Sequence, residues 1–100
     1  MEKYNIRMYK SAIKDLEDIV DYINTLSQET ALRQYDSIIK KIESLAEMPE
    51  RCHLLKDPNL RLKGYRGLIV DNFVVFYIIK DSTVQIRRIL YSKRNYEWML

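Results

Sequence analysis

The spacing of apolar residues changes halfway along the chain, and this change limits the fold more than any other feature. Between residues 11 and 49, apolar side chains recur every three or four positions, which is the period of amphipathic helices. From residue 65 onward they form short runs rich in Val, Ile, Tyr and Phe, which are typical of strands. For a chain of 100 residues, this order predicts a single domain of the α+β class, residues 1–100.

The helical half of the chain predicts two helices. Ser11 is suited to cap the first helix, which is expected over about residues 11–26. The second helix begins near Thr30 and ends before Pro49, since proline cannot continue a helix. Because only a few residues separate the two helices, we expect them to lie antiparallel as a helical hairpin.

The strand-like runs predict a sheet. Residues 3–9 alternate between an apolar and a polar face, whereas residues 50–64 show no period and are expected to be an irregular connection. Separators of two or three residues join the runs 65–70, 73–79 and 83–90, which indicates consecutive β-hairpins around a central strand. The predicted order is β-α-α-β-β-β, with an antiparallel sheet packed on the N-terminal helical hairpin. The other face of the sheet is left to a basic, aromatic surface or to a partner.

Charge is distributed unevenly between the two halves of the chain. Residues 1–50 carry 7 Lys/Arg and 10 Asp/Glu, a net charge of −3, whereas residues 51–100 carry 10 Lys/Arg and 4 Asp/Glu, a net charge of +6. A basic half on a balanced domain suggests an anionic partner, either nucleic acid or an acidic protein segment. A solvated basic surface without a partner is the alternative.

The sequence lacks the residue patterns of secreted, membrane-spanning, metal-binding and phosphate-loop proteins. Cys52 is the only cysteine, and no apolar run is long enough for a signal peptide or a membrane span. The sequence therefore favours a reducing, cytoplasmic location without a membrane partner. His53 is the only histidine, and there is neither a Gly-rich phosphate loop nor a cluster of His and Cys. We expect no metal and no cofactor.

Five segments, in this order, resemble the RelE/ParE superfamily of toxins from bacterial type II toxin–antitoxin pairs. Residues 12–23 are similar to the first helix of the family, and residues 44–51 are similar to its second helix, which ends in proline. Residues 64–70 and 73–77 resemble the central hairpin, and residues 84–94 resemble the last strand. The resemblance spans nearly the whole chain and is nearer to the ParE, or plasmid-stabilisation, branch.

The resemblance implies a cytoplasmic toxin that a cognate antitoxin neutralises. A disordered antitoxin segment would fold onto a β-edge and onto exposed apolar positions of the helices. The superfamily has two activities. ParE-type members inhibit DNA gyrase, and RelE-type members cleave mRNA on the ribosome. A non-toxic binding protein of the same fold is a third interpretation. An uncovered apolar stripe on the helices would also predict a homodimer.

The nuclease interpretation requires cations for the charged transition state and groups that transfer protons. The resemblance places Arg66, Arg88 and Arg94 at basic positions of the superfamily. Tyr91 and Tyr96 could transfer protons or stack on bases. Two departures weaken this interpretation. The run 73–79 lacks the arginine that RelE-like nucleases carry in mid-strand, and Tyr91 stands where histidine is frequent. Tyrosine, with a pKa of about 10, is the poorer base at neutral pH.

The gyrase interpretation requires a binding surface and no proton shuttle. Arginine, tyrosine and tryptophan are the usual hot-spot residues of interfaces, and the C-terminal segment is rich in them. The candidate target-binding residues are Arg87, Lys93, Arg94, Tyr96 and Trp98. For Tyr91, Tyr96 and Trp98, packing of a C-terminal tail on the sheet is the alternative, and for Trp98 it is an equally good explanation.

Arg88 can be interpreted in two ways. It lies in phase with the apolar residues of its strand, so it is expected to point toward the apolar face, where a charge must be paired. The candidate partners are Asp15, Asp18 and Asp21 on the first helix. Arg88 is then either a structural ion pair or a functional cation. Arg66 stands beside Gly67, which allows close approach of a ligand or forms a bulge.

Overall fold

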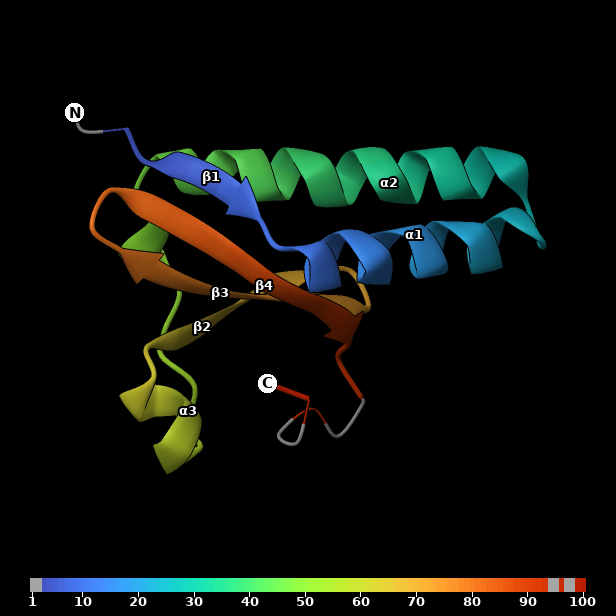
Figure 1. Ribbon diagram of the computed structural model, residues 1–100. Coiled ribbons are helices and arrows are strands. Elements are labelled where there is room, and N and C mark those ends of the chain that lie inside the picture. The colour runs from blue at the N-terminus through green and yellow to red at the C-terminus, as the bar shows by residue number, and fades with distance from the viewer. Residues whose placement is uncertain (1–2, 94–95, 97–98) are drawn as a thin grey trace.

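The helices and strands follow the predicted order. The computed structural model describes residues 3–93, 96 and 99–100 (Figure 1). Its elements are β1 (Asn5–Met8), α1 (Lys10–Asn24), α2 (Gln28–Glu43), the 3-10 turns η1 (Ser44–Ala46) and η2 (Pro49–Arg51), α3 (Pro58–Leu62), β2 (Tyr65–Val70), β3 (Phe73–Lys80) and β4 (Thr83–Tyr91). The β-α-α-β-β-β order of the α+β class is confirmed, and the connection that was expected to be irregular contains η2 and the short helix α3.

The sheet is mixed, so the prediction of a purely antiparallel sheet is wrong in one respect. Its strand order is β1-β4-β3-β2, and β2–β3 and β3–β4 are antiparallel hairpins. The first strand, however, pairs in parallel with the last, with Ile6 opposite Val84. Parallel neighbours need a long crossover, and the helical hairpin with two further strands provides it. Short-range patterns describe the hairpins but carry no signal for this pairing.

Both hairpin loops have two residues. One consists of Asp71 and Asn72, and the other of Asp81 and Ser82. Asp71 and Asp81 adopt positive φ values of 55° and 56°. The left-handed region is strained for most residues but is accessible to aspartate, which explains why these tight loops close without glycine. Lys80, which was expected in the second loop, is the last residue of β3.

The two long helices pack side by side on one face of the sheet (Figure 1). Their inward stripes include Ala12 and Ile38, which are fully buried against Tyr77 and other residues of the sheet. The predicted helical hairpin is thus confirmed. The predicted cap is wrong, because α1 begins at Lys10 with Tyr9 at its N-cap. The helix starts as soon as the strand ends, since the backbone N–H of Tyr9 still bonds to β4.

Tyr77 ties the sheet to the segment that follows the helices. Its side chain is fully buried and its hydroxyl donates to the Pro49 carbonyl oxygen at 2.6 Å. Burial raises the pKa of Tyr77 well above its ordinary value, so the hydroxyl remains protonated and can donate. Beside it, the Arg66 guanidinium donates to the carbonyl oxygens of Cys52 at 2.6 Å and Glu50 at 3.3 Å.

The second face of the sheet is divided into two parts. An apolar cluster covers one part, where Leu60 of α3 packs with Tyr65, Phe76 and Leu90 of the sheet. C-terminal residues also join this cluster, namely Tyr96, Met99 and Leu100. The other part carries arginine and tyrosine side chains, which are described below. The expectation of a basic, aromatic face therefore holds for only part of the sheet.

Candidate functional site

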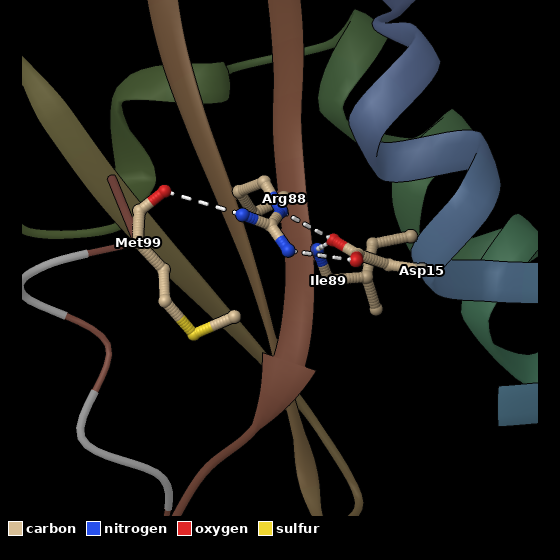
Figure 2. Close-up of polar contacts among 4 residues, drawn as sticks. All are labelled: Asp15, Arg88, Ile89 and Met99. Atoms are coloured by element: carbon tan, nitrogen blue, oxygen red, sulfur yellow. Dashed lines mark hydrogen bonds and ion pairs between the residues drawn. The ribbon is translucent and has the colours of Figure 1, made fainter. Parts of the chain in front are cut away.

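Arg88 on β4 lies at the centre of a polar network between α1 and the C-terminal residues (Figure 2). Its Nε and Nη2 donate to the two carboxylate oxygens of Asp15, at 2.7 and 2.9 Å. The same carboxylate accepts the backbone N–H of Ile89 at 3.0 Å, and Arg88 Nη1 donates to the Met99 carbonyl oxygen at 3.2 Å. β1 ends at Met8, and beyond it Asp15 satisfies the N–H of Ile89 in β4.

A β-bulge sets the direction of Arg88. Phe76 pairs with Arg88 but Tyr77 pairs with Ile86, so Arg87 is an extra residue without a partner on β3. Past the bulge the strand changes phase, and Ile89 takes the place in the helix-facing core that the alternation had given to Arg88. The expected phase was wrong for this reason, whereas Asp15 was among the expected partners.

The ion pair accounts for Arg88 as a structural residue. Hydrogen bonding to Asp15 raises the pKa of Arg88 above its ordinary value, so the guanidinium is charged at any ordinary pH. The two side chains are 21% and 12% exposed, so the pair is shielded from most solvent and salt. A bidentate arginine–carboxylate pair of this kind is the strong, geometrically defined form of ion pair.

The described members of the predicted nuclease set do not form one cluster. Arg66 contacts the 50–52 segment beside β2, whereas Arg88 contacts α1 beside β4, and β3 lies between the two strands. Tyr91 is half exposed and its ring lies 4.7 Å from the ring of Phe73. Arg94 lies outside the described residues.

Gly67 allows neighbouring side chains to pack closely on β2. The β2–β3 register runs past it without interruption, so the bulge expected there is absent and the bulge instead lies in β3–β4. A Cβ atom at Gly67 would lie 3.1 Å from Val74 and 3.4 Å from Leu55. The glycine thus allows the chain around Leu55 to approach the sheet closely.

The predicted target-binding residues lie in different surroundings. Arg87 is partly buried, with its guanidinium carbon 4.6 Å from the centre of the Tyr9 ring and 5.8 Å from that of Tyr65. Lys93 is exposed, whereas the Tyr96 ring packs 4.6 Å from Phe76, as the tail-packing alternative expected. The last two candidates, Arg94 and Trp98, lie outside the described residues.

Arg7 was not among the candidate residues, although the structure places it against the same tyrosine ring as Arg87. Its guanidinium carbon lies 5.2 Å from the centre of the Tyr9 ring, the same ring that Arg87 contacts. The signal was present in the alternation of residues 3–9, which puts Arg7 and Tyr9 on the face away from the helices. What the sequence did not show was that β1 lies next to β4.

An apolar groove runs along the helical hairpin. It has a volume of about 380 Å³ and its walls are mostly apolar. Ile13 and Tyr35 on these walls are 45% and 42% exposed, so the groove presents large apolar side chains to solvent. Glu17 and Asp21 also line the groove. Its lining is Met8, Ile13, Leu16, Glu17, Val20, Asp21, Tyr35 and Ile39.

Within the part of the chain that the structure describes, no three His, Cys, Asp or Glu residues lie close enough together to hold a metal ion. His53 is exposed and Cys52 is a half-buried free thiol. None of the described helices is both long and apolar enough to cross a bilayer.

Together these elements define a small α+β protein, with a helical hairpin on a four-stranded sheet. The chain is similar to a solved structure, the chromosomal ParDE toxin–antitoxin system from P. aeruginosa, with a TM-score of 0.76. The two share 22% identity, over 89% of this chain and 96% of that one, and this likeness establishes the fold. No curated protein sequence matches the chain significantly.

The family follows from the sequence itself. The family model described as the ParE toxin of the type II toxin–antitoxin system, parDE, matches residues 6–96. The chain therefore belongs to the ParE toxin family, and the predicted membership of the RelE/ParE superfamily is confirmed.

Proposed function

We propose that this toxin arrests bacterial growth by binding DNA gyrase and that a cognate antitoxin holds it inactive. Membership of the ParE family supports the choice of target. The observation that carries the proposal is the engagement of Arg88, whose donors bond to Asp15 and to the Met99 carbonyl oxygen. A guanidinium held in this way stabilises the fold and has little freedom to approach a phosphorane.

The surface that would meet gyrase lies around Arg87 and the end of β4. Arg87 is supported by two tyrosine rings, and Lys93 is exposed just after the strand. Arginine and aromatic side chains in partly desolvated positions are the common anchors of protein interfaces. Binding of this kind asks for a shaped, charged surface and for no group that moves a proton.

The antitoxin is proposed to cover the groove between α1 and α2. The groove exposes Ile13 and Tyr35 and is lined by Glu17 and Asp21, so it suits a helix with an apolar stripe and basic flanks. Burying this apolar surface would provide most of the binding free energy. Two copies of the free toxin could cover the same groove, so we extend the proposal to a homodimer in the absence of antitoxin.

The gyrase proposal is tested by a supercoiling assay with the purified toxin. We expect inhibition by the parent chain, and a concentration for half-inhibition that rises about tenfold or more in Arg87→Ala/Lys93→Ala, because hot-spot truncations have effects of this size. The matched control is Lys40→Ala/Lys41→Ala, which removes two exposed positive charges from α2. Unimpaired supercoiling at high molar excess of the parent toxin would end the proposal.

Cells that express the toxin alone separate the competing activities. Growth arrest with DNA damage and without codon-positioned mRNA ends agrees with gyrase inhibition. Codon-positioned 5′ ends on ribosome-bound mRNA would instead establish a RelE-like nuclease, and Arg94 and Tyr91 would be the first residues to replace. Normal growth would identify a non-toxic binding protein of the same fold.

The groove is tested with Ile13→Lys, which places a charge on its wall. We expect antitoxin affinity to fall about tenfold or more, since the lysine must be desolvated on binding, and gyrase inhibition to persist. Leu62→Lys on α3 is the control, because Leu62 is 88% exposed and lies outside the groove. Equal affinity of the antitoxin for both variants would place its binding surface elsewhere. Sedimentation of Ile13→Lys without antitoxin tests the homodimer, which the lysine should dissociate.

A further inference from the structure

The sheet face opposite the helices carries a row of residues that reaches across all four strands. Arg7 of β1 is paired with Gln85 of β4, Gln85 with Ile78 of β3, and Ile78 with Tyr65 of β2. Arg87 stands next to this row at the bulge and contacts the Tyr65 ring from two strands away. The row thus brings together basic and aromatic residues that are far apart in the sequence.

Arg7 and Arg87 carry charges that no carboxylate neutralises within the described ranges. There, the ion pairs are Lys14–Asp18 and Arg88–Asp15, and neither includes these two arginines. Among the described residues, Arg87 donates to the Gln85 side-chain oxygen at 3.3 Å. Contact with tyrosine rings stabilises a guanidinium but leaves its positive charge in place.

The position of these guanidinium groups suits an anion with several oxygens. Arg7 and Arg87 each lie over the Tyr9 ring, and stacking on a ring leaves the N–H groups at the guanidinium edge available. The fork of N–H donors matches the oxygens of a phosphate or a carboxylate. Because the tyrosine rings restrict the arginine side chains, less conformational entropy is lost when the anion binds.

Among the residues that the structure describes, three aromatic rings on this side of the sheet are in contact with other side chains. The rings of Tyr9 and Tyr65 contact the Arg87 guanidinium, and the Phe76 ring packs on Tyr96. Proteins that bind single strands offer free aromatic rings on which unstacked bases lie. A duplex keeps its bases stacked and presents phosphates, which arginine contacts without reading the sequence.

We propose that Arg7 and Arg87, held on Tyr9 and Tyr65, bind the phosphate backbone of double-stranded DNA. The choice of DNA over duplex RNA rests on the proposed function, since gyrase acts on DNA. This toxin would then contact the DNA that gyrase holds as well as gyrase itself. Binding is independent of sequence and weakens as salt rises, because each phosphate contact releases counterions.

The experiment measures binding of a fluorescently labelled 20-base-pair duplex to the purified toxin, without gyrase, between 50 and 200 mM salt. In Arg7→Gln/Arg87→Gln we expect affinity at the lowest salt to fall about tenfold or more. The slope of log affinity against log salt should become shallower by about 1.8, which is the value for two lost phosphate contacts. The control is Lys40→Gln/Lys41→Gln, which removes the same charge from α2 and should change affinity by less than about twofold.

A second double variant distinguishes the loss of phosphate contacts from a loss of folded protein. Arg7→Lys/Arg87→Lys retains the charge, so it should retain most of the salt slope while losing part of the affinity through the missing fork of donors. Unfolding curves of all variants show whether each one is folded. If neither double variant of the two arginines differs from the parent chain, the proposal is wrong.

Three further outcomes would overturn it. Equal losses in the arginine and lysine variants would mean that only net charge matters. A single-stranded oligonucleotide that binds more tightly than the duplex would point to base stacking. Competition by polyglutamate as effective as that by DNA would assign the face to an acidic protein segment. Gyrase inhibition by the parent chain is measured in a separate assay. A parent chain that inhibits gyrase but does not bind the duplex rejects the DNA-binding proposal alone. A parent chain that binds the duplex but does not inhibit gyrase rejects the proposed function alone.

Discussion

Arg87 and Arg88 are neighbours in β4, but the bulge between them and β3 places them in different chemical environments. Arg88 forms a bidentate pair with Asp15 and also bonds to a backbone carbonyl oxygen. Arg87 stacks on two tyrosine rings and has no carboxylate within the described part of the chain. A neutralised arginine stabilises the fold, whereas an arginine without a counter-charge is available to a partner.

This comparison also separates the two sides of the molecule. The helix layer contains the apolar groove, in which binding would be driven by burial of hydrophobic surface. The open face of the sheet contains Arg7 and Arg87, where binding would be electrostatic. Two partners with opposite chemistry could therefore bind this small toxin without competing for one surface.

The largest effect is expected from Asp15→Ala. The substitution leaves Arg88 without its counter-charge and Ile89 without an acceptor for its N–H, so the free energy of unfolding should fall by about 3 kcal/mol. Urea denaturation measures the change. Asp18→Ala is the control, because its pair with Lys14 is exposed to solvent and contributes little to the free energy of unfolding. Similar losses in both variants would mean that the Arg88 pair is no stronger than a surface pair.

A smaller effect should distinguish the two neighbouring arginines directly. Arg88→Lys retains the charge but loses the bidentate geometry, which should lower the free energy of unfolding by about 1–2 kcal/mol. Arg87→Lys should lower it by less than about 1 kcal/mol, since stacking on tyrosine contributes about that much at a partly exposed site. If Arg87→Lys proved the more destabilising of the two, the assignment of a structural role to Arg88 alone would be wrong.

The smallest effect concerns Tyr9, the ring that Arg7 and Arg87 share. Tyr9→Ala should lower the free energy of unfolding by about 1 kcal/mol, because two cation–π contacts are lost. The same variant should weaken DNA binding about threefold to tenfold, since the arginines lose their support. Tyr9→Phe retains the ring and should leave both quantities nearly unchanged. Anisotropy and urea denaturation give the two measurements, and equal effects of the two substitutions would show that the hydroxyl matters instead of the ring.

Most of the fold could be predicted because its signals are local. The helical period, the two-residue loops at Asp71 and Asp81 and the apolar run of β3 all act within a few residues. The candidate site was predicted only in part. Arg87 belonged to the expected binding residues, whereas Arg7, Tyr9 and Tyr65 did not, because no short-range pattern places β1 beside β4.

The sequence by itself determined the kinds and order of the elements, the helical hairpin and the family. Only the tertiary structure decided that β1 pairs in parallel with β4, that a bulge separates Arg87 from Arg88, and that Asp15 is the partner of Arg88. The physical reason is distance along the chain. Periodicity and turn chemistry act between near neighbours. Asp15 and Arg88 are 73 positions apart and meet only when α1 packs beside β4.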